Sequence, residues 1–160
     1  SDVLGVDREM GWSLSSDRYV TPVDSHPITA DLGARSFDPG ESTLGIVPVA
    51  PDVEVVLNNE HGITLATHQF GRGRSVYFAG LPWNPDNNRL LHRAIHWAAS
   101  DWADYDQWHT DDARVEIAHY PSTGATLAYS IALEPVHTKV HGPTRTWDVS
   151  LTAGGYRWLE

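Results

Sequence analysis

The sequence predicts an α/β domain followed by a small antiparallel β domain, and three observations lead to this expectation. The stretch from His68 to Ala99 has the order strand, glycine turn, strand, proline turn and amphipathic helix. Within it, residues 75–79 form a nearly continuous apolar run, which is typical of a strand covered on both faces in an α/β sheet. Beyond residue 110 the hydrophobic pattern changes to a period of two, as expected for half-buried strands.

The first half of the chain begins with turns and continues with strands. Residues 1–50 are rich in turn formers and leave room only for short pieces such as Ile46–Val49. Strands are predicted over Val53–Leu57 and Ile63–Phe70, with a turn at 60–62 between them. A glycine turn then reverses the chain into the strand at 75–79, which is the best candidate for a central strand of the sheet.

The helix that follows is the best specified element. Asn84 is placed to cap its first turn, and Pro85 suits the first helical position, where its missing N–H is harmless. The Asp86 carboxylate favours the positive end of the helix dipole. Apolar residues then recur at intervals of three and four, which predicts one buried face and one solvated face. The predicted buried face consists of Leu90, Leu91, Ala94, Ile95, Trp97 and Ala98, and the predicted solvated face carries Arg89, His92 and Arg93.

A change in composition marks the predicted domain boundary. Residues 100–112 contain five aspartates and two tryptophans, which indicates a short polar helix and a linker. We therefore expect one domain over residues 1–110 and a second over residues 111–160. The strands of the second domain are predicted over 114–120, 125–133, 136–140, 144–151 and 156–159.

Charge and composition exclude several kinds of partner. The 160-residue chain has a net charge of −10 and a single lysine, Lys139, so it has no basic stripe for nucleic acid or anionic lipid. It also lacks an apolar run long enough for a membrane span and a signal peptide at its start, which predicts a cytoplasmic protein. The absence of cysteine excludes disulfides, cysteine-ligated zinc and thiol nucleophiles. A start without methionine that runs directly into apolar residues suggests the C-terminal part of a larger protein.

The candidate motifs for phosphate and metal binding are weak. Residues 71–74, Gly-Arg-Gly-Arg, could approach a phosphate, but they lie between two strands, and a hairpin turn is the better interpretation. His92 and His96 have the spacing of two metal ligands on a helix, yet no third ligand is evident. His137 and His141 form a pair of similarly low specificity. We therefore assign no metal site, cofactor site or catalytic residue, and we expect no cofactor.

Carboxylates and aromatic side chains are abundant, but their number does not define a site. Asp7, Glu9 and Asp17 lie near arginines and are expected to be solvated charges, and no GxSxG nucleophile motif occurs. Trp12 and Trp83, in turn-rich surroundings, are candidates for contact with a ligand. The remaining tryptophans that we interpret, all expected in the core, are Trp97, Trp147 and Trp158.

Several segments together resemble one enzyme family. The chain is similar throughout to the 1,3-β-galactosyl-N-acetylhexosamine phosphorylases, also called lacto-N-biose phosphorylases, of glycoside hydrolase family 112. The segments that carry the resemblance are FGRGRSVY at 70–77, GLPW at 80–83, NNRLLHRAIHW at 87–97, GVDREMGWSLSSDRY at 5–19, HPITAD at 26–31, VEIAHY at 115–120 and GYRWLE at 155–160.

The resemblance implies an architecture and a reaction. Members of the family have a TIM-type barrel, a central α/β domain that resembles an inactive glutamine amidotransferase, and a small C-terminal β domain. On this basis the first domain here is an incomplete amidotransferase-like, or flavodoxin-like, domain. The family cleaves a β-galactosyl linkage with phosphate and inversion, and its general acid belongs to the barrel, so no catalytic residue is carried over to this chain.

The sequence thus predicts the C-terminal scaffold portion of a galactosyl-N-acetylhexosamine phosphorylase, inactive by itself. Its expected partners are the barrel of the parent enzyme and a second subunit in a homodimer, with the sugar and phosphate bound mainly elsewhere. The alternative is a non-catalytic carbohydrate-binding or subunit-interface module, which the seven tryptophans motivate.

Overall fold

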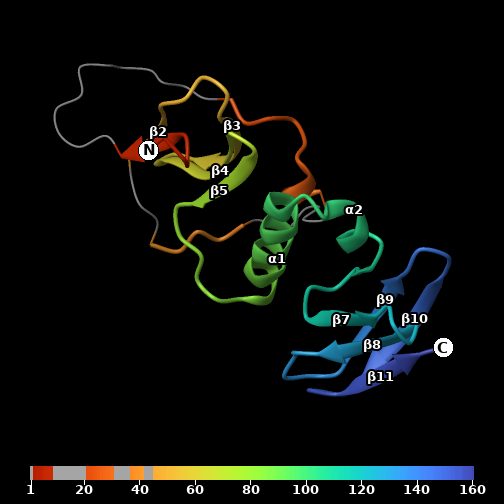
Figure 1. The fold of residues 1–160 in the computed structure, drawn as a ribbon. Helices are drawn as coiled ribbons and strands as arrows, with labels where there is room; N and C mark the ends of the chain where they lie inside the picture. The colour runs from red at the N-terminus through yellow and green to blue at the C-terminus, as the bar shows by residue number, and fades with distance from the viewer. Residues whose placement is uncertain (1, 9–20, 31–36, 42–44) are drawn as a thin grey trace. The chain divides into compact units, whose positions relative to one another are not determined.

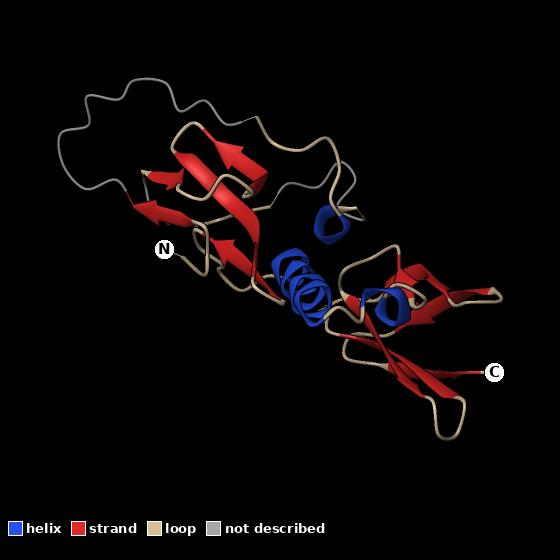
Figure 2. Cartoon of the chain, turned by 45° about the horizontal axis from the view of Figure 1, so that its top comes forward, coloured by secondary structure: helices blue, strands red, loops and turns tan. Residues whose placement is uncertain are grey.

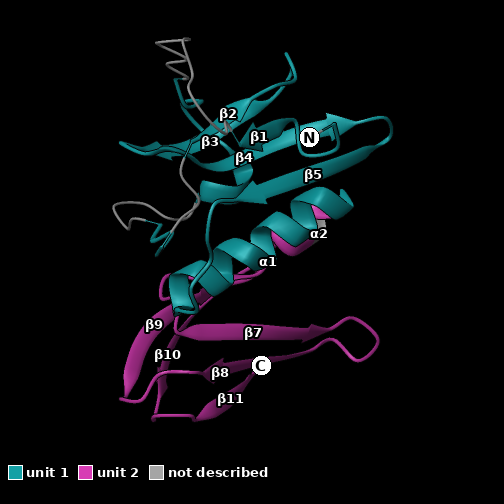
Figure 3. Ribbon diagram, turned by 90° about the vertical axis from the view of Figure 1, so that its left-hand side faces the viewer, with its two compact units in different colours: residues 1–100 teal, residues 101–160 magenta. Residues whose placement is uncertain are grey.

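The computed structural model describes residues 2–8, 21–30, 37–41 and 45–160 (Figure 1). The chain divides into two compact units, residues 1–100 and residues 101–160 (Figure 3). Each unit has its own hydrophobic core. The assignment of residues 1–110 and 111–160 to two domains of a larger protein stays a prediction.

The first unit is built on a three-stranded antiparallel sheet in the order β3-β4-β5. Its strands are β3 (Glu54–Asn59), β4 (Gly62–Phe70) and β5 (Gly73–Phe78). The turn before β4 is closed by the Asn59 side chain, whose Oδ1 accepts a hydrogen bond of 2.8 Å from the His61 N–H. In the next turn Gly71 has a φ of 60°, which glycine adopts without strain. Both predicted hairpins are therefore confirmed.

Both faces of this sheet are covered. On one face α1 (Pro85–Ala99) and the 3₁₀ turn η1 (Pro27–Thr29) pack against the strands. The core of this face consists of Ile28, Val56, Leu65, Leu90 and Ala94. The other face packs against a small antiparallel ribbon of β1 (Val6–Arg8) and β2 (Ile46–Pro48). The core of that face consists of Val6, Ile46, Val55, Ile63 and Ala66.

Helix α1 begins where the sequence predicted. The Asn84 side chain accepts a hydrogen bond from the Asn87 N–H at 2.8 Å, and Pro85 takes the first helical position. The helix ends at Ser100, which has a left-handed φ of 65° and donates its N–H to the carbonyls of the last turn. These contacts satisfy backbone groups that a helix leaves unpaired at its ends.

The predicted faces of α1 are correct only in part. Leu90 and Ala94 are buried, as predicted, but Ile95 is 54% exposed. Arg93, which was placed on the solvated face, is buried and 3% exposed. Its guanidinium donates hydrogen bonds to the carbonyls of Pro27 and Ile28. A distant segment therefore supplies the partners that let this charge enter the core, and helical periodicity alone could not reveal them.

The expected flavodoxin-like α/β domain is not confirmed. Every strand pair among the described residues is antiparallel, and the described part of the chain is mostly β structure with one long helix (Figure 2). The strand expected at the centre, β5, is an edge strand that pairs with β4 alone in the described sheet. Its run is apolar because Val76 and Phe78 pack toward the helix while Tyr77 packs toward the ribbon. Coverage of this strand on both faces was correctly predicted, whereas its central position in the sheet was not.

The second unit begins with a short helix, α2 (Trp102–Tyr105), and continues as antiparallel β structure. Two three-stranded sheets have the orders β10-β9-β6 and β11-β8-β7. Their strands are β6 (His109–Thr110), β7 (Val115–Tyr120), β8 (Ala125–Ser130), β9 (Val136–His141), β10 (Thr146–Leu151) and β11 (Tyr156–Leu159). The core between them includes Val115, Ala128, Val140, Val149 and Leu159. The small antiparallel β module is thus confirmed.

The two tryptophans that were predicted in the core of this module differ. Trp147 is partly buried against the core and stacks on Trp108, with ring centroids 5.8 Å apart. Trp158, however, is 50% exposed, because it alternates with the buried Leu159 and lies on the outer face of its sheet.

Among the described residues, no helix combines the length and apolar character needed to cross a membrane.

Candidate functional site

The described structure does not assemble the weak sequence candidates into a site. Among the residues that it describes, no three His, Asp or Glu side chains form a group that could hold a metal ion. His92 and His96 lie partly exposed on α1. His137 contacts Ser150 Oγ at 2.9 Å, whereas His141 contacts Asp111 Oδ1 at 2.8 Å, so the two histidines of this pair have separate partners.

The other candidates are equally dispersed. Residues 71–74 form the turn and start of β5, as the hairpin interpretation predicted. Trp83 is 76% exposed in the loop before α1. Asp7 is exposed, and its Oδ1 accepts a hydrogen bond from the neighbouring Arg8 N–H at 2.8 Å. Trp12, Glu9 and Asp17 lie outside the described residues.

A polar hollow of about 210 Å³ among the described residues of the first unit is a candidate for a site there. Strands β3, β4 and β5 and the last turn of α1 supply most of its lining. The lining residues are Asp52, Glu54, Thr67, His68, Gln69, Arg74 and Trp97. Of these residues, the sequence indicated only Trp97, as a core residue, and Arg74, as part of the turn at 71–74. The others come from separate segments that the hairpins bring together, so no local motif marks them.

His68 lines this hollow and contacts Val3, near the start of the chain. Its Nδ1 lies 3.0 Å from the Val3 carbonyl oxygen, and its Nε2 lies 3.1 Å from Asp52 Oδ1. Ser75 donates its hydroxyl to the same Val3 carbonyl at 2.6 Å. Both ring nitrogens of His68 therefore face oxygen acceptors of the chain itself, which gives this buried side chain a structural role.

His26 is a second buried histidine, next to the hollow. Its Nδ1 accepts a hydrogen bond from the Ile28 N–H at 3.2 Å, so the ring proton resides on Nε2. That proton faces Thr67 Oγ1 at 3.5 Å, and the ring packs against Trp97 with centroids 5.1 Å apart. Burial lowers the pKa of His26, although the nearby Glu54 carboxylate opposes the effect. This histidine therefore caps η1 in its neutral form.

Arg74 also lines the hollow. Its guanidinium lies 5.1 Å from the centre of the Trp97 ring, and Nη1 donates to the Trp97 carbonyl at 3.1 Å. A cation at the carbonyl end of α1 is also favoured by the helix dipole. The carboxylates of Asp52 and Glu54 can accept hydrogen bonds from a polar ligand, but the histidines and the arginine already bind groups of the chain. The side chains around the hollow therefore connect the strands, α1 and η1. This is a structural role and not one in acid–base chemistry.

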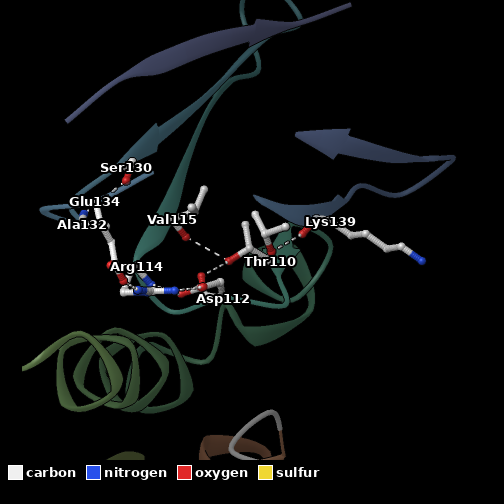
Figure 4. A network of polar contacts seen from close by, with 9 residues as sticks. Thr110, Asp112, Arg114, Val115, Ser130, Ala132, Glu134 and Lys139 are labelled. Carbon is white, nitrogen blue, oxygen red and sulfur yellow. Dashed lines mark hydrogen bonds and ion pairs between the residues drawn. The ribbon is translucent and has the colours of Figure 1, made fainter. Parts of the chain in front are cut away.

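In the second unit, a network of ion pairs and hydrogen bonds around Arg114 likewise holds neighbouring segments of the chain together (Figure 4). Nε and Nη2 donate to the two carboxylate oxygens of Asp112 at 3.0 and 2.7 Å, and Nη1 donates to Glu134 Oε1 at 2.7 Å. The paired carboxylates raise the pKa of Arg114. The Thr110 hydroxyl lies 2.9 Å from the Val115 carbonyl oxygen. These contacts fix residues 111–114 between β6 and β7, of which residues 111 and 112 belong to the predicted linker.

Comparison with known proteins relates the chain to one family. A family model described as "Lacto-N-biose phosphorylase central domain" matches residues 1–103. The chain belongs to the lacto-N-biose phosphorylase family. The resemblance that the sequence motifs indicated is therefore confirmed.

Curated relatives of the lacto-N-biose phosphorylase family match the chain along its length. A 1,3-beta-galactosyl-N-acetylhexosamine phosphorylase of Lachnoclostridium phytofermentans is 33% identical over 160 residues, which cover 99% of this chain and 22% of the relative. One from Bifidobacterium longum subsp. longum is 31% identical over 191 residues, covering 100% of this chain and 25% of the relative. A D-galactosyl-beta-1->4-L-rhamnose phosphorylase of Lachnoclostridium phytofermentans is 29% identical, covering 92% of this chain and 20% of the relative. The chain thus spans about a quarter or less of the length of these relatives.

Proposed function

We propose that this chain is the C-terminal scaffold portion of an inverting β-galactoside phosphorylase. The reaction of the whole enzyme is the conversion of galactosyl-β-1,3-N-acetylhexosamine and phosphate to α-galactose 1-phosphate and N-acetylhexosamine. The observation that carries this proposal is the match to galactosyl-N-acetylhexosamine phosphorylases over essentially the whole chain.

The chemistry of this reaction assigns few tasks to protein side chains. Phosphate attacks the anomeric carbon on the face opposite the leaving hexosamine, which inverts the configuration. One carboxylic acid protonates the leaving oxygen, and phosphate takes the place of the activated water of an inverting hydrolase. We propose that this acid lies in a TIM-type barrel that is not part of the present chain.

The contacts of the polar side chains support a scaffold role. His26 caps η1, His68 holds Val3, and Arg74 binds the end of α1. Arg114 is likewise occupied by two carboxylates. In the proposed enzyme these units pack against the barrel or against a second subunit of a homodimer. We also propose a cytoplasmic location, because the charge of a sugar phosphate keeps it from crossing a membrane after its release.

The test of the scaffold role is a turnover assay. The chain is incubated with galactosyl-β-1,3-N-acetylglucosamine and inorganic phosphate, and galactose 1-phosphate is measured by a coupled enzymatic assay. We expect no release above a control without protein, and release above that control would contradict the proposal. The Bifidobacterium longum relative, assayed in parallel, serves as the positive control.

A second experiment tests the proposed partner. The remaining three quarters of the Bifidobacterium longum relative, expressed separately, are mixed with the present chain and analysed by size-exclusion chromatography. Co-elution at equal amounts is expected if the chain packs against the barrel. Separate elution of two folded proteins would argue against this arrangement.

A further inference from the structure

The second unit carries a row of aromatic rings on the outer face of the sheet β11-β8-β7. Strand register places Tyr156 opposite Tyr129, and Trp158 opposite Leu127. The alternate residues of the same strands, including Leu159 and Ala128, point into the core. We call the outer set the aromatic face, and its members are Tyr156, Trp158, Tyr129, Leu127, Ala125, Tyr120, Ala118 and Glu116.

The aromatic face is open to solvent. Tyr156 is 68% exposed, Trp158 is 50% exposed and Tyr120 is 46% exposed. Tyr120 and Trp158 lie next to each other, with ring centroids 6.1 Å apart and the ring planes inclined by 43°. Exposed aromatic rings that lie side by side offer flat apolar surfaces on which a ligand can pack, so this face is a candidate binding surface.

The charge of the aromatic face favours a neutral ligand. Its charged member is the Glu116 carboxylate, whose Oε2 accepts a hydrogen bond of 2.5 Å from the Tyr129 hydroxyl. A carboxylate at this position, on a chain of net charge −10, disfavours phosphate, nucleic acid and other anions. The remaining members are uncharged rings and aliphatic groups, which bind neutral groups by packing.

The size of the aromatic face argues against a protein partner. Strands about 4.8 Å apart with a rise of about 3.4 Å per residue give a three-stranded face, five residues long from Glu116 to Tyr120, of roughly 250 Å². A stable protein interface buries about 800 Å² on each partner. The face is therefore too small for a second copy of the chain, although it is wide enough for one or two sugar rings.

We propose that the aromatic face binds the pyranose rings of a neutral saccharide. The C–H bonds on one side of a pyranose carry partial positive charge and pack against the negative face of an aromatic ring. The tyrosine hydroxyls and the Glu116 carboxylate can then meet the sugar hydroxyls at the edge. This surface goes beyond the proposed scaffold role, and only the choice of a galactoside as the first probe rests on the proposed function.

The test is a binding titration of the whole chain without phosphate. Galactosyl-β-1,3-N-acetylglucosamine is added while intrinsic tryptophan fluorescence and ligand saturation-transfer NMR are recorded. We expect saturable binding in the millimolar range, which Trp158→Ala weakens roughly tenfold through loss of an exposed aromatic ring. Trp158→Phe keeps a ring and should retain most of the affinity. Leu133→Ala, at a residue that is 99% exposed in the same unit but is no member of the face, is the matched control.

Several results would overturn the proposal. These are the absence of saturable binding, binding that Trp158→Ala leaves unchanged in a variant with a native circular dichroism spectrum, and an equal response to sorbitol, which has no ring face. A dimer of the native chain that Trp158→Ala dissociates in sedimentation velocity would instead assign the face to self-association. Failure of the proposed function would appear separately, as galactose 1-phosphate in the turnover assay.

Discussion

The buried Arg93 provides the sharpest test of how the first unit is held together. Its Nη2 donates to the Pro27 carbonyl at 2.7 Å, and its Nε lies 3.1 Å from the Ile28 carbonyl oxygen. The side chain is 3% exposed, and Ile28 is 0% exposed. Arg93→Met keeps the length and the apolar stem of the side chain but removes the donors. The segment η1 then loses its hydrogen bonds to α1.

The expected loss follows from these contacts. A hydrogen bond from a charged donor contributes about 1.5–3 kcal/mol, and a buried acceptor without a partner costs about 1–3 kcal/mol. The substitution leaves the buried carbonyl of Ile28 without this donor, whereas the carbonyl of the exposed Pro27 can accept a hydrogen bond from water instead. Removal of the buried charge offsets part of the loss. We therefore expect Arg93→Met to lower the free energy of unfolding by about 3 kcal/mol, and Arg93→Lys, which keeps one donor group, to lower it by about half as much.

The measurement is urea unfolding followed by circular dichroism at 222 nm, because the long helix α1 belongs to the first unit. With a slope of about 2 kcal/mol per molar urea, the midpoint should fall by roughly 1.5 M for Arg93→Met. Arg72→Met, at an exposed position in the hairpin turn, is the control and should change stability by less than about 0.5 kcal/mol. A loss below about 1 kcal/mol for Arg93→Met would refute the reasoning.

Three further predictions concern single side chains. Burial lowers the pKa of His26 below its ordinary value of 6.5, so the unfolded chain binds a proton at this histidine more readily than the folded chain does. The contribution of neutral His26 to the free energy of unfolding is therefore complete above pH 6.5 and is lost as the pH falls below it. His26→Asn keeps an acceptor for the cap and should flatten that pH dependence in thermal unfolding measured from pH 7 to pH 5. Burial and the hydrogen bond to Glu116 raise the pKa of Tyr129 to about 12, so Tyr129→Phe should remove a step near pH 12 from an absorbance titration at 295 nm; an unchanged titration would contradict this assignment. A Cβ at Gly142 would lie 2.8 Å from Trp108 and 2.9 Å from Trp147, so Gly142→Ala should cost about 1–3 kcal/mol and change the near-ultraviolet circular dichroism. Gly73→Ala is the steric control, because a Cβ there would make only an ordinary contact of 3.6 Å with the Phe70 carbonyl oxygen.

Local signals in the sequence predicted most elements of the fold. The Asn84 cap and Pro85 specified the start of α1, and the Gly71 turn specified a hairpin, because each depends on residues that are neighbours in the chain. The period of two likewise predicted the strands of the second unit. These features needed no knowledge of distant segments.

The candidate sites depended on contacts that are remote in sequence. The partners of Arg93 lie 65 and 66 residues away, and His68 binds a carbonyl 65 residues away. Trp158 fits the alternating pattern of its strand, but the pattern alone cannot tell which side of the strand meets the other sheet. Burial of an arginine and exposure of a tryptophan were therefore not predictable from local periodicity.

The sequence by itself determined the family, the helix, the hairpins and the exclusion of thiol chemistry, since these depend on residue identity and short-range order. Only the tertiary structure decided that β5 is an edge strand, that Arg93 is buried and that the aromatic face points outward. The physical reason is the same for all three. Strand order and burial depend on which distant surfaces supply hydrogen bonds and apolar contacts, and such pairings are not written in the spacing of neighbouring residues.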